Sequence, residues 1–168
     1  MTVRPTTEDD WQQIRALRLE MIRDTSEGFT ETIEDALLHD EQEWRMRGRR
    51  SRAENSASFA AVDPPGRWVG VMGGWIPDAS TGPLLVGVYV TPLHRGRRAG
   101  VADRLLDAVE GWAGAHGPTL RLAVHEDNRR ARAFYARRGF VLTGGSEPYA
   151  LDPTRRELGM VLVLEKEQ

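Results

Sequence analysis

The chain has 168 residues, which favours one domain spanning 1–168, and its 40% hydrophobic and 29% charged residues exclude a disordered or fibrous protein. It contains no cysteine, which excludes disulfides, a thiolate zinc site and a cysteine nucleophile, and its net charge of −2 does not favour general nucleic-acid binding. Residues 1–10 contain no apolar run, and no stretch has the roughly 18 apolar residues of a membrane span, so we expect a cytoplasmic protein.

The first third of the chain predicts a short strand followed by two helices. Residues 3–4 form the strand, and residues 7–10 have the cap and acidic side chains that begin a helix. Apolar residues then recur at helical spacing until residues 25–28 break the pattern. A second helix begins at Thr32 and ends near the arginine cluster 45–50.

Three strands are predicted next. Residues 58–62 and 67–76 are separated by a Pro- and Gly-rich turn, and together they predict a hairpin. Residues 84–90 are apolar on both faces, which is typical of a central strand that is covered on both sides. Gly87 within this strand indicates a bulge or the close approach of another backbone.

The remaining segments alternate between helix and strand. The segment after Gly100 carries an apolar helical stripe that ends at Gly117, and residues 120–125 alternate as a strand. A helix runs from Asn128 to Arg138, where Gly139 is a natural stop. Two closing strands, residues 140–142 and 157–164, surround a loop. About seven strands and four helices predict an α+β domain.

The junction after strand 84–90 has the chemistry of an anion site. A helix N-terminus offers unpaired backbone N–H groups and a partial positive charge. Gly96 and Gly100 let this backbone approach a ligand closely, and Arg95, Arg97 and Arg98 surround it. The residues of a P-loop and of a dinucleotide fingerprint are both missing. The junction therefore predicts a pyrophosphate cradle of another kind.

Two segments match patterns that occur together in one protein family. The first is Arg97-Arg98-Ala99-Gly100-Val101-Ala102, which fits Arg/Gln-x-x-Gly-x-Gly/Ala, and the second is 128–140, which fits Asn-x-x-Ala-x-x-Phe-Tyr-x-x-x-Gly-Phe. In this order and with one strand between them, they resemble the GNAT superfamily of acyl-CoA N-acyltransferases. The chain departs from the family at one point. Counted from Pro92, the family arginine falls at Arg95, so the loop is two residues longer than usual.

The resemblance implies an α/β/α layered, GNAT-like fold with an about seven-stranded, mixed, mostly antiparallel sheet whose fourth and fifth strands splay apart. It implies that the pantetheine arm of acetyl-CoA lies in this splay and that the pyrophosphate binds at residues 97–102. No metal is implied. The implied cofactor-binding residues are Val88, Tyr89, Val90, Arg95, Arg97, Arg98, Ala99, Gly100, Val101, Ala102, Asn128, Ala131 and Tyr135.

The resemblance also implies acetyl transfer to a primary amine of a small molecule or peptide, by direct attack and a tetrahedral intermediate, with Tyr135 as the general acid. Periodicity alone makes Tyr135 a core aromatic, and capping alone makes Asn128 an N-cap. Family members often place a Glu on the fourth strand, but residues 84–90 contain no acid. The candidates for the general base are Glu27, Glu126, His125 and a chain of water molecules.

The resemblance implies that the region between the first two helices helps to form the acceptor side, and Phe29, Trp75 and Tyr149 are candidate lining residues. Residues 1–44 carry twelve acids against four arginines, whereas residues 95–138 carry ten arginines against five acids. The acidic segment favours a cationic amine and the basic segment favours a polyphosphate, although two solvated helix faces would explain the same charges.

Two other function classes compete with this interpretation. A CoA-binding regulatory module with the same fold would bind acetyl-CoA with little turnover, and the strand without an acid keeps this alternative open. A nucleic-acid binder is disfavoured because the basic segment lacks interleaved aromatic residues. Many members of the resembled family form homodimers, so a homodimer is a possible assembly, and neither a nucleic-acid nor a membrane partner is expected.

Overall fold

The computed structural model describes residues 1–165, and residues 166–168 of the predicted domain lie outside the described part. Seven strands are present in these residues: β1 (Thr2–Pro5), β2 (Ser56–Asp63), β3 (Arg67–Trp75), β4 (Leu84–Val90), β5 (Thr119–His125), β6 (Val141–Tyr149) and β7 (Asp152–Val163). The α-helices are α1 (Trp11–Asp24), α2 (Ile33–Leu37), α3 (Glu41–Arg49), α4 (Val101–Gly114) and α5 (Arg129–Arg137).

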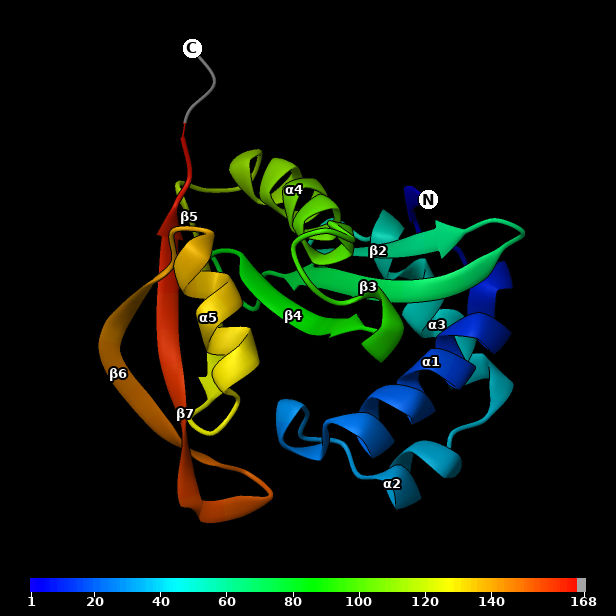
Figure 1. Cartoon of the computed structure of the whole chain (residues 1–168), viewed down its shortest axis with the longest axis horizontal. Coiled ribbons are helices and arrows are strands. Elements are labelled where there is room, and N and C mark those ends of the chain that lie inside the picture. The colour runs from blue at the N-terminus through cyan, green and yellow to red at the C-terminus, as the bar shows by residue number, and fades with distance from the viewer. Residues whose placement is uncertain (166–168) are drawn as a thin grey trace.

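The strands form one sheet in the order β1-β2-β3-β4-β5-β7-β6. The neighbouring strands are antiparallel except β4 and β5, which run parallel. Figure 1 shows α4 on one side of the β2–β4 part of the sheet and α1 and α3 on the other. The predicted seven-stranded, mixed, mostly antiparallel and layered fold is therefore confirmed. None of the helices in the described residues is long and apolar enough to cross a bilayer.

Each face of the sheet has its own hydrophobic core. The apolar stripe of α4, which includes Leu105 and Val109, packs on one face, and the stripe of α1 packs with Trp44 on the other. The central strand β4 contributes to both cores, because Leu85 is buried under α4 and Tyr89 is buried under α1. This burial on both faces explains why residues 84–90 are almost continuously apolar.

Gly87 interrupts the regular alternation of β4. Its φ is +60°, a left-handed conformation that glycine adopts without strain. The register between β3 and β4 shifts by one residue between Val71 and Gly73, opposite Gly87. Because a bulge moves the following side chains to the other face, Leu85 and Val90 reach the same core although they lie five positions apart. The predicted bulge is confirmed.

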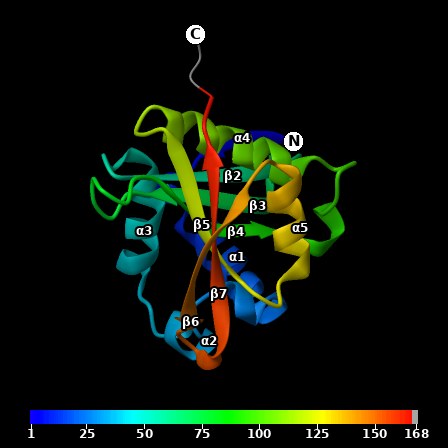
Figure 2. The same ribbon diagram turned by 90° about the vertical axis from the view of Figure 1, so that its left-hand side faces the viewer.

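Beyond this region, β4 and β5 separate soon after they meet. One residue pair, Leu84 with Arg121, registers the two strands, and the Arg121 N–H also donates to the Pro83 carbonyl oxygen at 3.1 Å. On its other side β5 is paired along its whole length with β7, and Figure 2 shows β6 and β7 crossing in front of β5 with α5 beside them. The predicted splay is confirmed.

Two predicted segments were wrong. The helix expected after Thr32 is two helices, because the Asp40 side chain accepts the Glu43 N–H at 3.0 Å and begins α3, so the described residues contain five α-helices rather than four. The cap predicted at residues 7–10 is confirmed, since Thr7 is the N-cap of the 3₁₀ turn Glu8–Asp10, which leads directly into α1. Most of the loop expected between the closing strands belongs to β6 and β7. Pro148 is tolerated there because β6 is an edge strand.

Candidate active site

A cavity of about 1030 Å³, the main cavity, lies where β4 and β5 separate. Residues 84–90 of β4 and 121–125 of β5 line it from two sides, and residues 28–30 line it from the α1–α2 connection. Helix α5 contributes Ala131 and Tyr135. An extended ligand in this cavity would lie between two strand edges, whose backbone N–H and C=O groups are not used by a β4–β5 ladder beyond residue 84.

The predicted strand residues Val88, Tyr89 and Val90 all line the main cavity. The Tyr89 side chain points away from α5, because its hydroxyl donates to Glu20 of α1 at 3.0 Å. Burial and the Glu20 carboxylate raise the pKa of this hydroxyl above its ordinary value. Tyr89 therefore offers backbone groups to the cavity while its side chain joins β4 to α1.

The N-terminus of α4 lies at one end of the main cavity. Gly100 is the N-cap with φ +65°, and Gly96 has φ +100°, so both occupy conformations that favour glycine. A Cβ on Gly100 would meet no atom within 4 Å, which leaves room for a ligand beside the helix N-terminus. Arg97 and Ala102 line the cavity, whereas Arg98, Ala99, Gly100 and Val101 do not, and Val101, the first residue of α4, is buried.

Two arginines of the junction have different environments. The Arg95 guanidinium donates to the Val90 carbonyl oxygen at 2.8 Å, forms an ion pair with Asp24 and lies 5.5 Å from the ring centre of Tyr89. These contacts fix the loop to the ends of β4 and α1. Arg97 is exposed and also lines the main cavity. Arg97 is therefore the residue of the pair that is available to a bound pyrophosphate.

Helix α5 brings Asn128, Ala131 and Tyr135 to the main cavity. The Asn128 Oδ1 accepts the Ala131 N–H at 3.2 Å, so Asn128 is an N-cap as capping alone predicts. Its amide nitrogen carries two further hydrogen-bond donors. The capping role and the ligand-binding role use different atoms, so the observed cap is compatible with the predicted one.

Tyr135 lies at the boundary between the core and the main cavity. It is 5% exposed and its ring centre lies 5.5 Å from that of Phe140, yet the residue lines the cavity. Burial raises the pKa of its hydroxyl above the ordinary value, and this is the single cause of the shift. The phenol therefore stays protonated at neutral pH and can supply a proton.

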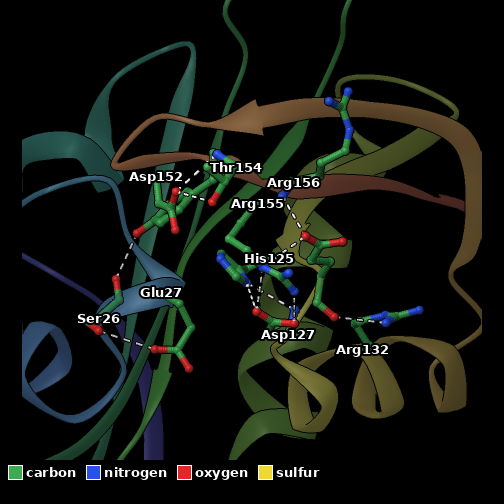
Figure 3. A network of polar contacts seen from close by, with 11 residues as sticks. Ser26, Glu27, His125, Asp127, Arg132, Asp152, Thr154, Arg155 and Arg156 are labelled. Atoms are coloured by element: carbon green, nitrogen blue, oxygen red, sulfur yellow. Dashed lines mark hydrogen bonds and ion pairs between the residues drawn. The ribbon is translucent and has the colours of Figure 1, made fainter.

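Of the three residues predicted as bases, only His125 lines the main cavity. Its Nδ1 accepts the Asp127 N–H at 3.1 Å, as Figure 3 shows, so the neutral ring carries its proton on Nε2 and has no free lone pair. Glu126 is held by the Arg156 N–H at 3.0 Å and by Arg155 at 3.2 Å, outside the lining. Glu27 accepts a hydrogen bond from Ser26 at 3.4 Å and also lies outside the lining.

Besides Asp103 of α4, which is ion-paired with Arg137 and Arg138, two carboxylates that the sequence analysis missed line the main cavity, Glu147 of β6 and Glu157 of β7. They are directly opposite each other in the β6–β7 ladder. These two residues were not predicted to pair, because Glu147 was placed in a loop and Glu157 at the start of a strand. Within residues 1–165, no three His, Asp or Glu side chains gather closely enough to hold a metal ion.

The three predicted acceptor residues lie in different places. Phe29 lines the main cavity, and the Arg18 guanidinium lies 4.9 Å from its ring centre. The Tyr149 hydroxyl donates to the Phe29 carbonyl oxygen at 2.6 Å, so Tyr149 anchors the α1–α2 connection and lies outside the lining. Trp75 lines a second cavity of about 760 Å³, which shares Arg18, Val86 and Gly87 with the main cavity.

Much of the acidic charge in residues 1–44 is neutralised within the protein. Glu31 accepts hydrogen bonds from Arg47 and Arg18 and contacts His39 at 2.8 Å. Burial alone would raise the pKa of Glu31, but these three partners hold it well below its usual range. No acid of residues 1–44 lines either cavity. The charge imbalance that suggested a cationic amine therefore does not produce an acidic binding surface in the two cavities.

Residues 18–140 match the family model described as "Acetyltransferase (GNAT) family". No curated protein sequence matches the chain significantly. The matched range includes α1, the splayed strands, the N-terminus of α4 and the whole of α5.

Solved structures with the same fold include several acetyltransferases. An acetyltransferase of the GNAT family from Streptococcus pneumoniae is 18% identical and has a TM-score of 0.77, with 98% of this chain and 99% of that chain covered. The ribosomal-protein-alanine N-acetyltransferase from Brucella melitensis is 19% identical with the same TM-score, covering 98% of this chain and 100% of that one. A GNAT superfamily phosphinothricin acetyltransferase from Sinorhizobium meliloti, in complex with AcCoA, is 18% identical, with a TM-score of 0.76 and coverage of 97% and 88%.

Proposed function

The chain belongs to the GNAT family of acetyltransferases, and from this premise we propose that it transfers the acetyl group of acetyl-CoA to a primary amine of a small molecule or peptide. The observation that carries the proposal is the main cavity, which combines two open strand edges with a helix N-terminus. We treat residues 1–168 as one catalytic domain, because the seven strands of the described part form a single sheet.

The two parts of acetyl-CoA, its pantetheine arm and its pyrophosphate, each match groups that line the main cavity. Its pantetheine arm carries amide groups that can pair with the backbone of residues 88–90, and Asn128 faces the arm from α5. Its pyrophosphate matches the N–H groups of α4 and the guanidinium of Arg97. The phosphinothricin acetyltransferase that shares this fold was solved with acetyl-CoA, which supports this assignment.

In the proposed reaction, the amine nitrogen attacks the thioester carbonyl carbon, and a tetrahedral intermediate carries the negative charge on oxygen. A backbone N–H near Val88, beside the bulge, stabilises this oxyanion. The C–S bond then breaks as the new C–N bond is retained, and the Tyr135 hydroxyl donates its proton to the departing sulfur. The surplus proton of the amine passes to solvent or to Glu147 or Glu157, two of the carboxylates that line the cavity.

Substitution of Gly100 tests the donor site. Gly100→Glu places a carboxylate at the α4 N-terminus in a left-handed conformation, and we expect acetyl-CoA affinity to fall at least about a hundredfold because like charges repel. Gly111→Glu is the matched control, since it adds the same charge to the same helix where a Cβ meets no atom within 4 Å. Titration calorimetry measures both affinities.

The outcomes separate the competing functions. Binding of acetyl-CoA by the wild-type protein, lost in Gly100→Glu and kept in Gly111→Glu, followed by CoA release with at least one amine of a broad panel, supports the proposal. Binding without CoA release for any amine would favour the regulatory module. No binding by the wild-type protein would contradict both.

A further inference from the structure

The second cavity lies on the side of the sheet that α1 and α3 cover. Residues of both helices line it, together with the β2 and β3 strands and the loop that precedes β2. It shares Arg18, Val86 and Gly87 with the main cavity. Because Gly87 is the bulged residue of β4, a ligand in the second cavity reaches the main cavity beside Val88, where the proposed reaction places the thioester carbonyl.

The charged lining of the second cavity has one sign. Arg18, Arg47, Arg49 and Arg50 line it, and none of its described lining residues is Asp or Glu. The main cavity differs, since its lining includes both arginines and acids. A guanidinium of this lining that has no carboxylate partner attracts an anionic ligand and repels a cationic one.

Three of these arginines already have carboxylate partners. Arg18 and Arg47 share Glu31 at 2.8 Å, and Arg49 forms an ion pair with Glu8. Arg50 has no ion pair within residues 1–165. Arg50 is an exposed residue, yet partial desolvation of its guanidinium, and after it the neighbouring charge of Arg47, lower its pKa. A carboxylate that bound to Arg50 would neutralise the positive charge of its guanidinium.

The rest of the second cavity suits a small carbon skeleton. Leu17 and Met21 of α1 line it together with Trp68 and Trp75 of β3. An aromatic and aliphatic lining of this kind contacts the apolar part of a ligand, and a few polar groups fix its orientation. The polar groups here are the arginines described above.

We propose that the second cavity takes the acceptor and that Arg50 recognises a carboxylate carried by the same small molecule as the reactive amine. The acceptor is then an amino acid or a close analogue, with its amine directed at the Gly87 bulge. This inference rests on the proposed acetyl transfer and narrows its acceptor class, in place of the cationic amine expected from the charge of residues 1–44.

The test uses α-amino acids with apolar side chains, each paired with its own carboxamide, and spermidine as a cationic amine. For the wild-type protein, kcat/KM measured by CoA release is expected to favour the best amino acid over its carboxamide by at least about tenfold. In Arg50→Gln this preference disappears, because the KM for the amino acid rises while kcat is unchanged. This pattern is expected when a binding contact is lost. Arg52→Gln is the matched control, because Arg52 is exposed like Arg50 but lies outside the lining.

The measured quantities distinguish the possible failures. Equal or better turnover of carboxamides or spermidine would overturn the inference and leave acetyl transfer intact. Calorimetry of the amino acid with the CoA-loaded protein adds a readout that needs no turnover. Binding that depends on Arg50, without acetyl transfer, would keep this site and refute the proposed function. The absence of both binding and turnover of amino acids by a wild-type protein that binds acetyl-CoA would refute the inference.

Discussion

At the scale of single residues, Tyr135 shows how one side chain can belong to the core and also border a cavity. It is a residue of α5 whose ring packs in the hydrophobic core, and it still lines the main cavity. Burial raises the pKa of its hydroxyl above the ordinary value, so the phenol stays protonated over the whole neutral range. The same burial holds the ring in one orientation.

We expect Tyr135→Phe to lower kcat by about a hundredfold or more, because the departing thiolate loses its proton donor. Acetyl-CoA affinity should be unchanged, and the free energy of unfolding should stay within about 0.5 kcal/mol of the wild type, since the ring remains. Steady-state kinetics, calorimetry and urea denaturation measure these quantities. An unchanged kcat would show that another group or water protonates the sulfur.

The donor-side residues were predicted from local patterns in the sequence, whereas the lining of the two cavities depends on distant segments. The donor side depends on local patterns, such as a glycine at a helix N-cap, and the structure shows Gly100 in that position. The acceptor side depends on which distant segments meet. Nothing local in the sequence shows that Arg50 and Trp75 line one cavity, or that Glu157 lines another.

At the scale of elements, α3 approaches the start of the chain through a glycine. A Cβ on Gly48 would lie 2.2 Å from the carbonyl oxygen of Thr7, and the Thr6 hydroxyl donates to the Gly48 carbonyl oxygen at 3.1 Å. The backbones of α3 and the 3₁₀ turn Glu8–Asp10 therefore pack without an intervening side chain.

We expect Gly48→Ala to lower the free energy of unfolding by about 2 kcal/mol or more, because two backbones must move apart. Gly111→Ala in α4 is the control. It should raise stability by up to about 1 kcal/mol, because its Cβ meets open space and alanine favours the helix. Urea denaturation of both variants measures the difference, and equal effects would contradict this packing.

The elements with strong periodicity were predicted well, and those defined by pairing were not. The stripe of α4 predicts the helix that is observed, because its burial follows from its own sequence. The strand β6 is mostly exposed and contains Gly144, Gly145 and Pro148, so its composition indicates a loop. It is a strand because β7 supplies the hydrogen-bond partners, and a sequence pattern does not contain that information.

At the scale of the whole molecule, ion pairs between α4 and α5 join the two parts of the sheet that the splay separates. Arg138 contacts Asp103 at 3.1 Å, Asp107 at 2.7 Å and Glu110 at 3.0 Å. Only 15% of its side chain is exposed, so these contacts are less screened by water than ordinary surface pairs. Arg138 therefore links α5 to the helix that covers β2–β4.

We expect Arg138→Gln to lower the free energy of unfolding by about 1–3 kcal/mol, because three carboxylates lose a common partner. Arg137→Gln is the matched control. Arg137 pairs with Asp103 alone and is more exposed, so its loss should cost less than about 1 kcal/mol. Urea denaturation measures both variants, and equal costs would contradict the special position of Arg138.

The loss of unfolding free energy caused by Arg138→Gln should also depend on pH. Arg137 first, and Arg138 after it, hold the pKa of Asp103 below its ordinary value despite partial burial. The stability from this group is fully present above the ordinary pKa of about 3.9 and is lost as pH falls through the lowered value in the folded protein. The difference between the variant and the wild type should therefore shrink below about pH 4.

The separation of β4 from β5 has a consequence for turnover. Along most of the length of β4 and β5, the facing edges of the two strands do not pair with each other. In the proposed reaction the extended arm of the donor lies between these edges, as an added strand would. Free CoA retains the arm and the pyrophosphate after the acetyl group has left, so the product keeps nearly all the contacts that hold the donor. Product inhibition by CoA, competitive with acetyl-CoA, follows from this geometry, and CoA dissociation becomes a candidate for the slowest step of the cycle.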